Sequence, residues 1–136
     1  MDIAAEFLSA VINAFEANKR LADRAVGQVS DDKLHAALDA NTNSIAVIMK
    51  HVAGNLTSRW TDFLTTDGEK PWRNRDDEFV DTFTTRAEVL DCWERGWACL
   101  LTTAAVGEGG WVDLPDPIIV RAGEAFIAVP ELAQER

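Results

Sequence analysis

Positive charge is scarce in this chain of 136 residues. Its 13 lysines and arginines face 23 acidic residues, which leaves a net charge of −10, and no basic cluster offsets that charge locally. A surface of this kind repels phosphate groups. The composition therefore excludes duplex nucleic acid and anionic membrane surfaces as favoured partners.

Cysteine is also scarce, and the two that are present, Cys92 and Cys99, lie in one segment of helical periodicity. Seven residues of helix separate them by about 10 Å along the axis, whereas an unstrained disulfide needs roughly 4.4–6.8 Å between Cα atoms. We expect two reduced, packed thiols and a cytoplasmic location. A nucleophilic role is disfavoured because neither histidine is close to them in the sequence.

Long apolar runs and common catalytic motifs are missing as well. No stretch reaches the roughly 18 apolar residues of a membrane span, and the N-terminus has no basic region typical of a signal peptide. There is no G-x-S-x-G setting and no glycine-rich phosphate loop.

What the chain does contain is amphipathic helix. Apolar residues recur at spacings of three and four over about 2–27, 45–64 and 86–106, and the last segment opens with the capping-box pattern Thr85-Arg86-Ala87-Glu88. Trp93 and Trp97, one turn apart, are most simply core anchors. A short helical turn is expected over about 33–38.

The C-terminal part has a different pattern. Two short apolar runs flank Ala122-Gly123 and favour a small β-hairpin near 117–129, and good helix formers follow Pro130. We predict one domain over 1–136. Its fold would be all-α, an up-down bundle of four-helix type with the fourth helix missing or shortened.

A line of polar residues beside the apolar stripe of the second long helix is the candidate site. His51, Asn55, Arg59 and Asp62 follow at spacings of four, four and three, which place them on one helix face. Asn55, Arg59 and Asp62 could orient His51 or a substrate, or Arg59 and Asp62 could form a plain surface ion pair. The polar connection over 65–83 is long, and reads as a lid or as a loop held by Arg–carboxylate pairs.

Residues 43–79 read NSIAVIMKHVAGNLTSRWTDFLTTDGEKPWRNRDDEF. This stretch resembles the second helix and following loop of the DinB/YfiT-like metalloenzyme superfamily, in an uncharacterised bacterial branch. The segments 21–38 and 120–136 fit the same branch, so the resemblance covers nearly the whole chain.

The resemblance implies a four-helix bundle, often dimeric, with a divalent metal such as Zn, Ni or Fe held by three histidines. One of these lies on the second helix, where His51 matches it, and two form an H-x-x-x-H pair on the fourth helix. That pair has no counterpart in this sequence, and His35 does not match a ligand position. The metal site is therefore incomplete, and tight metal binding by this chain alone is not expected.

Two classes of function stay open. In the first, the protein is a metal-dependent enzyme, a transferase or isomerase acting on a small thiol-linked molecule. In the second, it is a non-catalytic bundle that acts by self-association or partner binding through the groove that an absent fourth helix leaves. Both readings predict a homodimer or larger oligomer.

Overall fold

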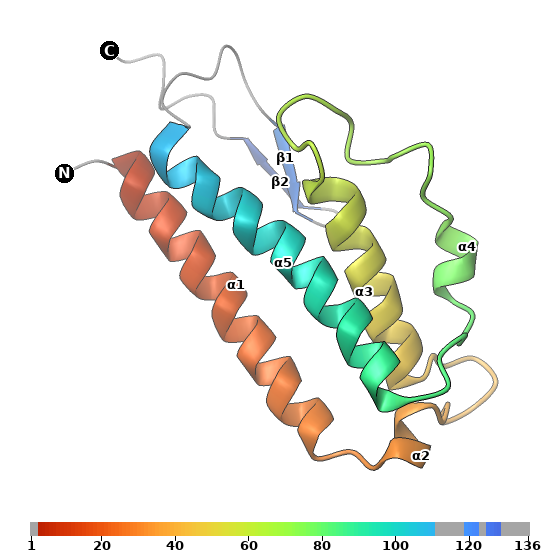
Figure 1. Cartoon of the computed structure of the whole chain (residues 1–136). Coiled ribbons are helices and arrows are strands. Elements are labelled where there is room, and N and C mark those ends of the chain that lie inside the picture. Colours follow the sequence, from red (N-terminus) through yellow and green to blue (C-terminus); the bar gives the residue numbers. More distant parts are fainter. Residues whose placement is uncertain (1–2, 111–118, 123–124, 129–136) are drawn as a thin grey trace.

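The computed structural model describes residues 3–110, 119–122 and 125–128. Three long helices lie side by side, with α5 between the other two (Figure 1). The elements in chain order are α1 (Ile3–Gly27), α2 (Asp31–Leu34), α3 (Ile45–Trp60), α4 (Arg75–Glu78), α5 (Arg86–Gly110), β1 (Ile119–Ala122) and β2 (Ala125–Ala128). The two strands pair antiparallel, within the range for which the sequence predicted a hairpin.

Side-chain caps fix where the helices begin. The Ser44 hydroxyl accepts the Val47 N–H at 3.2 Å at the start of α3. At the start of α5, Thr85 Oγ1 accepts the Glu88 N–H at 3.2 Å, and the Glu88 carboxylate accepts the Thr85 N–H at 3.3 Å. The predicted capping box is thus confirmed, and its reciprocal bonds satisfy backbone donors that the helix leaves free.

The end of α3 differs from the prediction. The apolar periodicity continues to Leu64, but the helix ends at Trp60 because Thr61 is extended and Asp62 has a φ of 47°. In that left-handed conformation the Asp62 carbonyl accepts the N–H groups of Thr65 and Thr66, each at 3.0 Å. The chain therefore turns off the helix axis before the predicted boundary.

The core lies where the three long helices meet. Trp93 and Trp97 of α5 are buried and pack edge to face, with ring centroids 5.5 Å apart. The Trp93 indole N–H reaches α1, where it donates to Asp23 at 2.8 Å. The other buried members of this cluster are Val26, Leu34, Ala46, Met49 and Val89. The prediction that the two tryptophans are core anchors is confirmed.

Helix direction corrects the predicted topology. Gly96 packs directly against Ala53, so that a Cβ on the glycine would come within 2.7 Å of the Ala53 Cα. One turn further along both helices, Cys99 lies beside Thr57 and Thr61. Because contact positions on α3 and α5 rise together, the two helices are parallel, and the predicted up-down order is wrong for this pair.

The connection over residues 61–85, here called the crossover segment, explains the parallel pair. It runs back along the outer side of α3 and returns the chain to the end where α3 began (Figure 1). Helix α1 is antiparallel to α5, since Lys19 pairs with Glu94 at 2.9 Å while Arg86 donates to the Val26 carbonyl at 3.2 Å. Long crossovers of this kind are a known variant of bundle topology.

The remaining predictions concern membrane spans, the two cysteines and two short helices. No helix among residues 3–110 is long and apolar enough to cross a membrane. Cys92 and Cys99 are not joined by a disulfide, and both are half-buried, less than the packed thiols that the sequence predicted. The short turn predicted over about 33–38 is instead α2 (Asp31–Leu34), which begins directly after Ser30. The helix start expected after Pro130 lies outside the described residues.

Candidate functional site

The crossover segment is held on α3 by hydrogen bonds at its two ends. Near the start of α3, Lys50 Nζ donates to the Asp77 and Val80 carbonyls, both at 2.8 Å, and to Thr82 Oγ1 at 3.0 Å. One ammonium group therefore satisfies acceptors spread over six residues of the segment, and fixes this part of it against the helix.

The other end is fixed by a buried serine and lysine. Ser58 Oγ donates to the Gly68 carbonyl at 2.6 Å and accepts the Lys70 N–H at 3.3 Å. The Lys70 ammonium is buried as well, and donates to the carbonyls of Ser58, at 2.7 Å, and Asp67. These bonds hold the tip of the segment against the last turn of α3.

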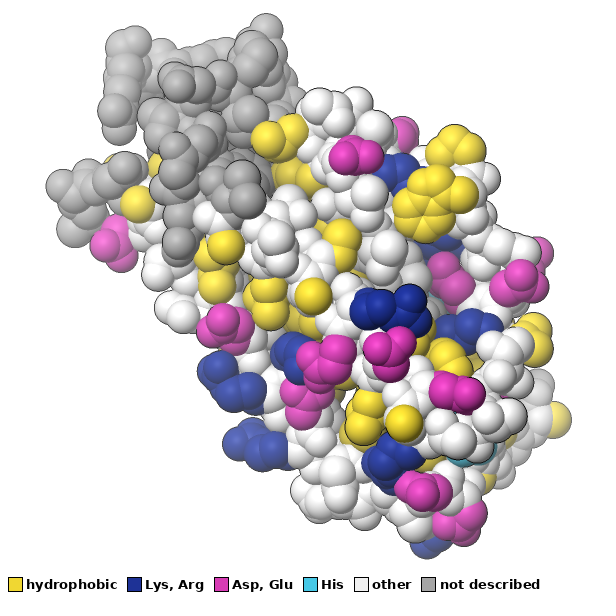
Figure 2. All heavy atoms as spheres, in the orientation of Figure 1, with side chains coloured by type: hydrophobic (Ala, Val, Ile, Leu, Met, Phe, Trp, Pro, Cys, Tyr) yellow, Lys and Arg dark blue, Asp and Glu magenta, His cyan; other side chains and the backbone are white. Residues whose placement is uncertain are grey.

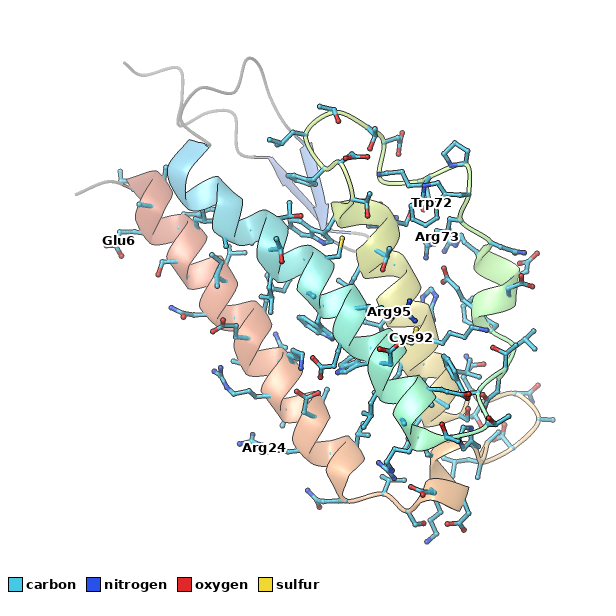
Figure 3. All side chains as sticks on the ribbon, in the orientation of Figure 1. Glu6, Arg24, Trp72, Arg73, Cys92 and Arg95 are labelled. Carbon is cyan, nitrogen blue, oxygen red and sulfur yellow. The ribbon has the colours of Figure 1, made fainter. Side chains whose placement is uncertain are left out.

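A histidine of α3 forms a cluster with a glutamate and an arginine of the crossover segment. Glu78, at the end of α4, is buried, and its Oε2 lies 2.8 Å from Nδ1 of His51. Arg73 meets the same carboxylate with two N–H groups, Nε to Oε1 at 2.8 Å and Nη2 to Oε2 at 3.1 Å. Figure 3 shows Arg73 on the crossover segment beside α3. We call these three residues the His–Glu–Arg cluster.

The electrostatics of the cluster keep Glu78 ionised. Burial alone raises the pKa of this carboxyl, but hydrogen bonds from Arg73 and His51 and the charge of Arg73 outweigh it, so that the pKa lies below its usual range. The bond to Glu78 in turn raises the pKa of Arg73. A buried carboxylate matched by a two-pronged guanidinium is therefore the stable state of this pair at neutral pH.

Gly54 provides the space that the carboxylate needs. A Cβ at this position would lie 2.5 Å from Glu78 Oε1 and 2.7 Å from its Cδ. A larger residue at position 54 would therefore require the Glu78 carboxylate to shift. The glycine thus has a role in the site that helix propensity alone would not favour.

The bond to Glu78 determines how a neutral His51 ring is protonated. An ionised carboxylate only accepts, so Nδ1 carries the proton and Nε2 keeps its lone pair. No residue in the described part of the chain hydrogen-bonds to Nε2. The ring is half-exposed and stacks on Phe79, with centroids 4.7 Å apart and planes at 29°. An oriented acceptor nitrogen can bind a metal ion or take up a proton.

The other residues predicted on the polar face have different roles. Asn55 lies one turn after His51, and its side chain hydrogen-bonds to no other residue in the described part of the chain. Arg59 pairs with Glu69 at 3.2 Å, so its predicted ion pair with Asp62 is not formed. Asp62 lies beyond the end of α3 and off its polar face, because of its left-handed backbone. Of the four residues on the predicted polar face, His51, Asn55 and Arg59 thus lie on α3, and Asp62 follows its end.

Sequence reasoning missed Glu78, Arg73 and Gly54. It did suggest that Arg–carboxylate pairs hold the long connection, and the pairs of Arg73 with Glu78 and Glu69 confirm that reading. The available signal was the unusual length of the connection. The partner of His51 could not be read from the sequence because Glu78 lies 27 residues away along the chain.

The second histidine has a similar bond elsewhere. His35, after α2, places Nδ1 2.6 Å from Asp81 Oδ2, so both histidines contact the crossover segment through a carboxylate. Both side chains of this pair are partly exposed, and among the residues that the structure describes no arginine pairs with Asp81. His35 is therefore a natural control for experiments on His51.

A metal ion needs more ligands than this site offers. Tightly bound transition metals generally take three or four protein ligands. In the ranges that the structure describes, no three His, Cys, Asp or Glu side chains are grouped to hold an ion. The described residues therefore fit one position of a metal site, at His51 Nε2, and no complete site.

The fold and the cluster together define a small helical protein in which a buried, arginine-bound carboxylate orients a histidine on a long helix. The chain belongs to the family described as "Protein of unknown function (DUF1572)", whose model matches residues 2–127. No curated protein and no solved structure matches it.

Proposed function

We propose that this protein is a DinB/YfiT-like, metal-dependent enzyme, a transferase or isomerase of a small thiol-linked molecule, in which His51 supplies one ligand. The observation that supports this is the bond from Nδ1 to Glu78. Histidines that bind metals commonly donate their other ring N–H to a carboxylate, which fixes the tautomer and makes the ligand nitrogen more basic. Glu78 and Arg73 fit that supporting role.

The chain's own part in such a site is to hold and orient. Arg73 keeps Glu78 ionised, Glu78 keeps the Nδ1 proton in place, and stacking on Phe79 limits rotation of the ring. A bound divalent ion would lower the pKa of a coordinated water or thiol. The remaining ligands would have to come from outside the described residues or from a second copy of the chain, so we expect weak binding by this chain alone.

Metal analysis tests the proposal. Purified protein is equilibrated by dialysis with Zn, Ni or Fe, and the bound metal is measured by mass spectrometry in the wild type and in the variants His51→Ala and His35→Ala. We expect the wild type and His35→Ala to hold metal above the level of the dialysis buffer, and His51→Ala to hold less. Equal binding in the wild type and both variants, or none in any of them, would refute a ligand role for His51.

A second function, self-association, is supported by α1. Its apolar residues Leu8, Val11, Ile12 and Phe15 are all only half-buried, and Ile3 and Phe7 are exposed. Figure 2 shows hydrophobic side chains at the surface over α1 and α5. Contiguous apolar surface of this kind is typical of interfaces. We therefore propose that the chain forms a homodimer through the first half of α1.

A further inference from the structure

Three arginines converge on one oxygen of Glu69 at the tip of the crossover segment. The distances to Oε1 are 3.2 Å from Arg59 Nη2, 3.3 Å from Arg73 Nη1 and 3.9 Å from Arg75 Nη1. Arg59 comes from α3, whereas Arg73 and Arg75 both come from the crossover segment, Arg75 at the start of α4. A single carboxylate oxygen thus lies at the meeting point of three guanidinium groups.

This gathering of positive charge is unusual for a chain with a net charge of −10. In these ion pairs the three arginines face two carboxylates, Glu69 and Glu78. The buried Lys70 ammonium lies next to Glu69 in the chain, and its hydrogen bonds go to carbonyl oxygens. The buried Nε of Arg59 has no hydrogen-bond partner in the part of the chain that the structure describes. The N–H donors of these arginines therefore outnumber the hydrogen bonds that the Glu69 carboxylate can accept.

Arg73 and Arg59 have contacts other than Glu69 that position them. Arg73, with 2% of its side chain exposed, is fixed by its two bonds to Glu78. Arg59, with 14% exposed, packs on Gly68, where a Cβ would come within 3.0 Å of Nη1. Glu69 itself is 41% exposed and lies on the solvent side of both. Replacing its carboxylate would therefore leave Arg73 bonded to Glu78 and Arg59 packed on Gly68.

We propose that this arginine cluster is a binding site for the carboxylate or phosphate group of a small molecule, and that Glu69 is the internal anion which the ligand displaces. Guanidinium groups recognise planar or tetrahedral oxyanions through paired N–H donors. An arriving anion takes over the bonds to Arg59 and Arg73 Nη1, and the Glu69 side chain turns outward to solvent. The exposed Arg75 adds attraction at the entrance.

The site adjoins the His–Glu–Arg cluster through a shared residue. Arg73 offers Nη1 to this site while Nε and Nη2 hold the carboxylate that orients His51. A molecule anchored here by an anionic group would have its remainder close to the face of α3 that carries His51 and Asn55. Assigning the anion to a substrate of His51 rests on the proposed function, whereas the anion site itself does not.

Titration with inorganic phosphate and with acetate, followed by calorimetry, tests the site. The main variant is Glu69→Gln, which removes the competing charge at an exposed position. Its matched control is Asp91→Asn, which removes the same charge from the exposed pair of Asp91 and Arg95 on α5. Both variants change the net charge equally, so they differ only in whether three arginines or one are released.

We expect Glu69→Gln to bind at least one of the two anions about tenfold more tightly than the wild type, given the strength of charge-assisted bonds. Asp91→Asn should match the wild type, and adding Arg75→Gln to Glu69→Gln should reverse part of the gain. If Glu69→Gln binds neither anion more tightly than Asp91→Asn, the cluster is an internal ion-pair network and the proposal is wrong. Repeating the titration in His51→Ala separates the two proposals, since anion binding should survive the loss of the ligand nitrogen.

Discussion

Glu78 is the residue on which the geometry of the site depends. It lies between a histidine and an arginine, and its charge is maintained only because those partners outweigh the cost of burial. Removing one partner of a buried ion pair generally costs more than the pair contributes, because the other charge is left unmatched. Substitutions at Glu78 should therefore affect stability and the state of the His51 ring together.

Glu78→Gln should lower the free energy of unfolding at neutral pH. It should also make that free energy less sensitive to acid. The pKa of Glu78 is lower in the folded chain than its ordinary value of 4.5. The carboxylate therefore stabilises the fold fully above about pH 4.5, and this contribution is lost as the pH falls through the lowered pKa. Urea denaturation over a pH series should show that acid lowers the free energy of unfolding less in the variant than in the wild type.

A comparison variant tests whether the effect on His51 is specific. Glu88, in the capping box of α5, also has a lowered pKa, because the backbone N–H and hydroxyl of Thr84 and the N–H of Thr85 bond to it. Glu88→Gln should likewise make the free energy of unfolding less sensitive to acid. Nitrogen NMR of the imidazole should show a changed proton position in Glu78→Gln and an unchanged one in Glu88→Gln. Unchanged His51 signals in both variants would argue against orientation by Glu78.

At the scale of the elements, close approach depends on two glycines of the long helices. Gly96 allows α5 to touch the backbone of α3, and Gly54 allows the crossover segment to place Glu78 on α3. Helix propensity disfavours glycine at both positions by about 1 kcal/mol relative to alanine. Their presence inside helices is therefore explained by contact with a neighbouring element.

Gly54→Ala should destabilise the protein even though alanine is the better helix former. The new Cβ would lie 2.5 Å from Glu78 Oε1, and overpacking of this kind costs about 1–3 kcal/mol. Gly27→Ala, at the end of α1 with nothing within 4 Å, is the matched control and should be neutral or slightly stabilising. Chemical denaturation of both variants gives the comparison. Equal stability would mean that Glu78 moves aside without cost.

Sequence periodicity predicted the elements better than their arrangement. The three long helices, the capping box and the buried tryptophans follow from local spacing, which nearby residues determine. The parallel pairing of α3 with α5 depends instead on how the crossover segment packs, and that packing rests on contacts such as Lys50 with Val80 and Ser58 with Gly68. For the same reason His51 was found from its helix face, while Glu78 and Arg73 were not.

At the scale of the whole molecule, burial is uneven. Core residues concentrate where α5 meets α3 and the second half of α1, and Val26 is the only residue of α1 classed as buried. The first half of the same helix carries exposed Ile3 and Phe7. Apolar area of this kind stabilises a complex by roughly 25 cal/mol per Å² when it is removed from water. This uneven burial is the reason that we place the proposed self-association surface on the first half of α1.

A charge on that surface should therefore dissociate the proposed homodimer. Phe7→Glu places a carboxylate in the apolar patch, and burying an unpaired charge at an interface costs several kcal/mol. Leu38→Glu, at a position 94% exposed in the connection before α3, adds the same charge away from α1. Sedimentation velocity should show a dimer for the wild type and for Leu38→Glu, and a monomer for Phe7→Glu. A wild-type monomer, or a dimer that Phe7→Glu leaves intact, would place any working surface of this protein elsewhere than on α1.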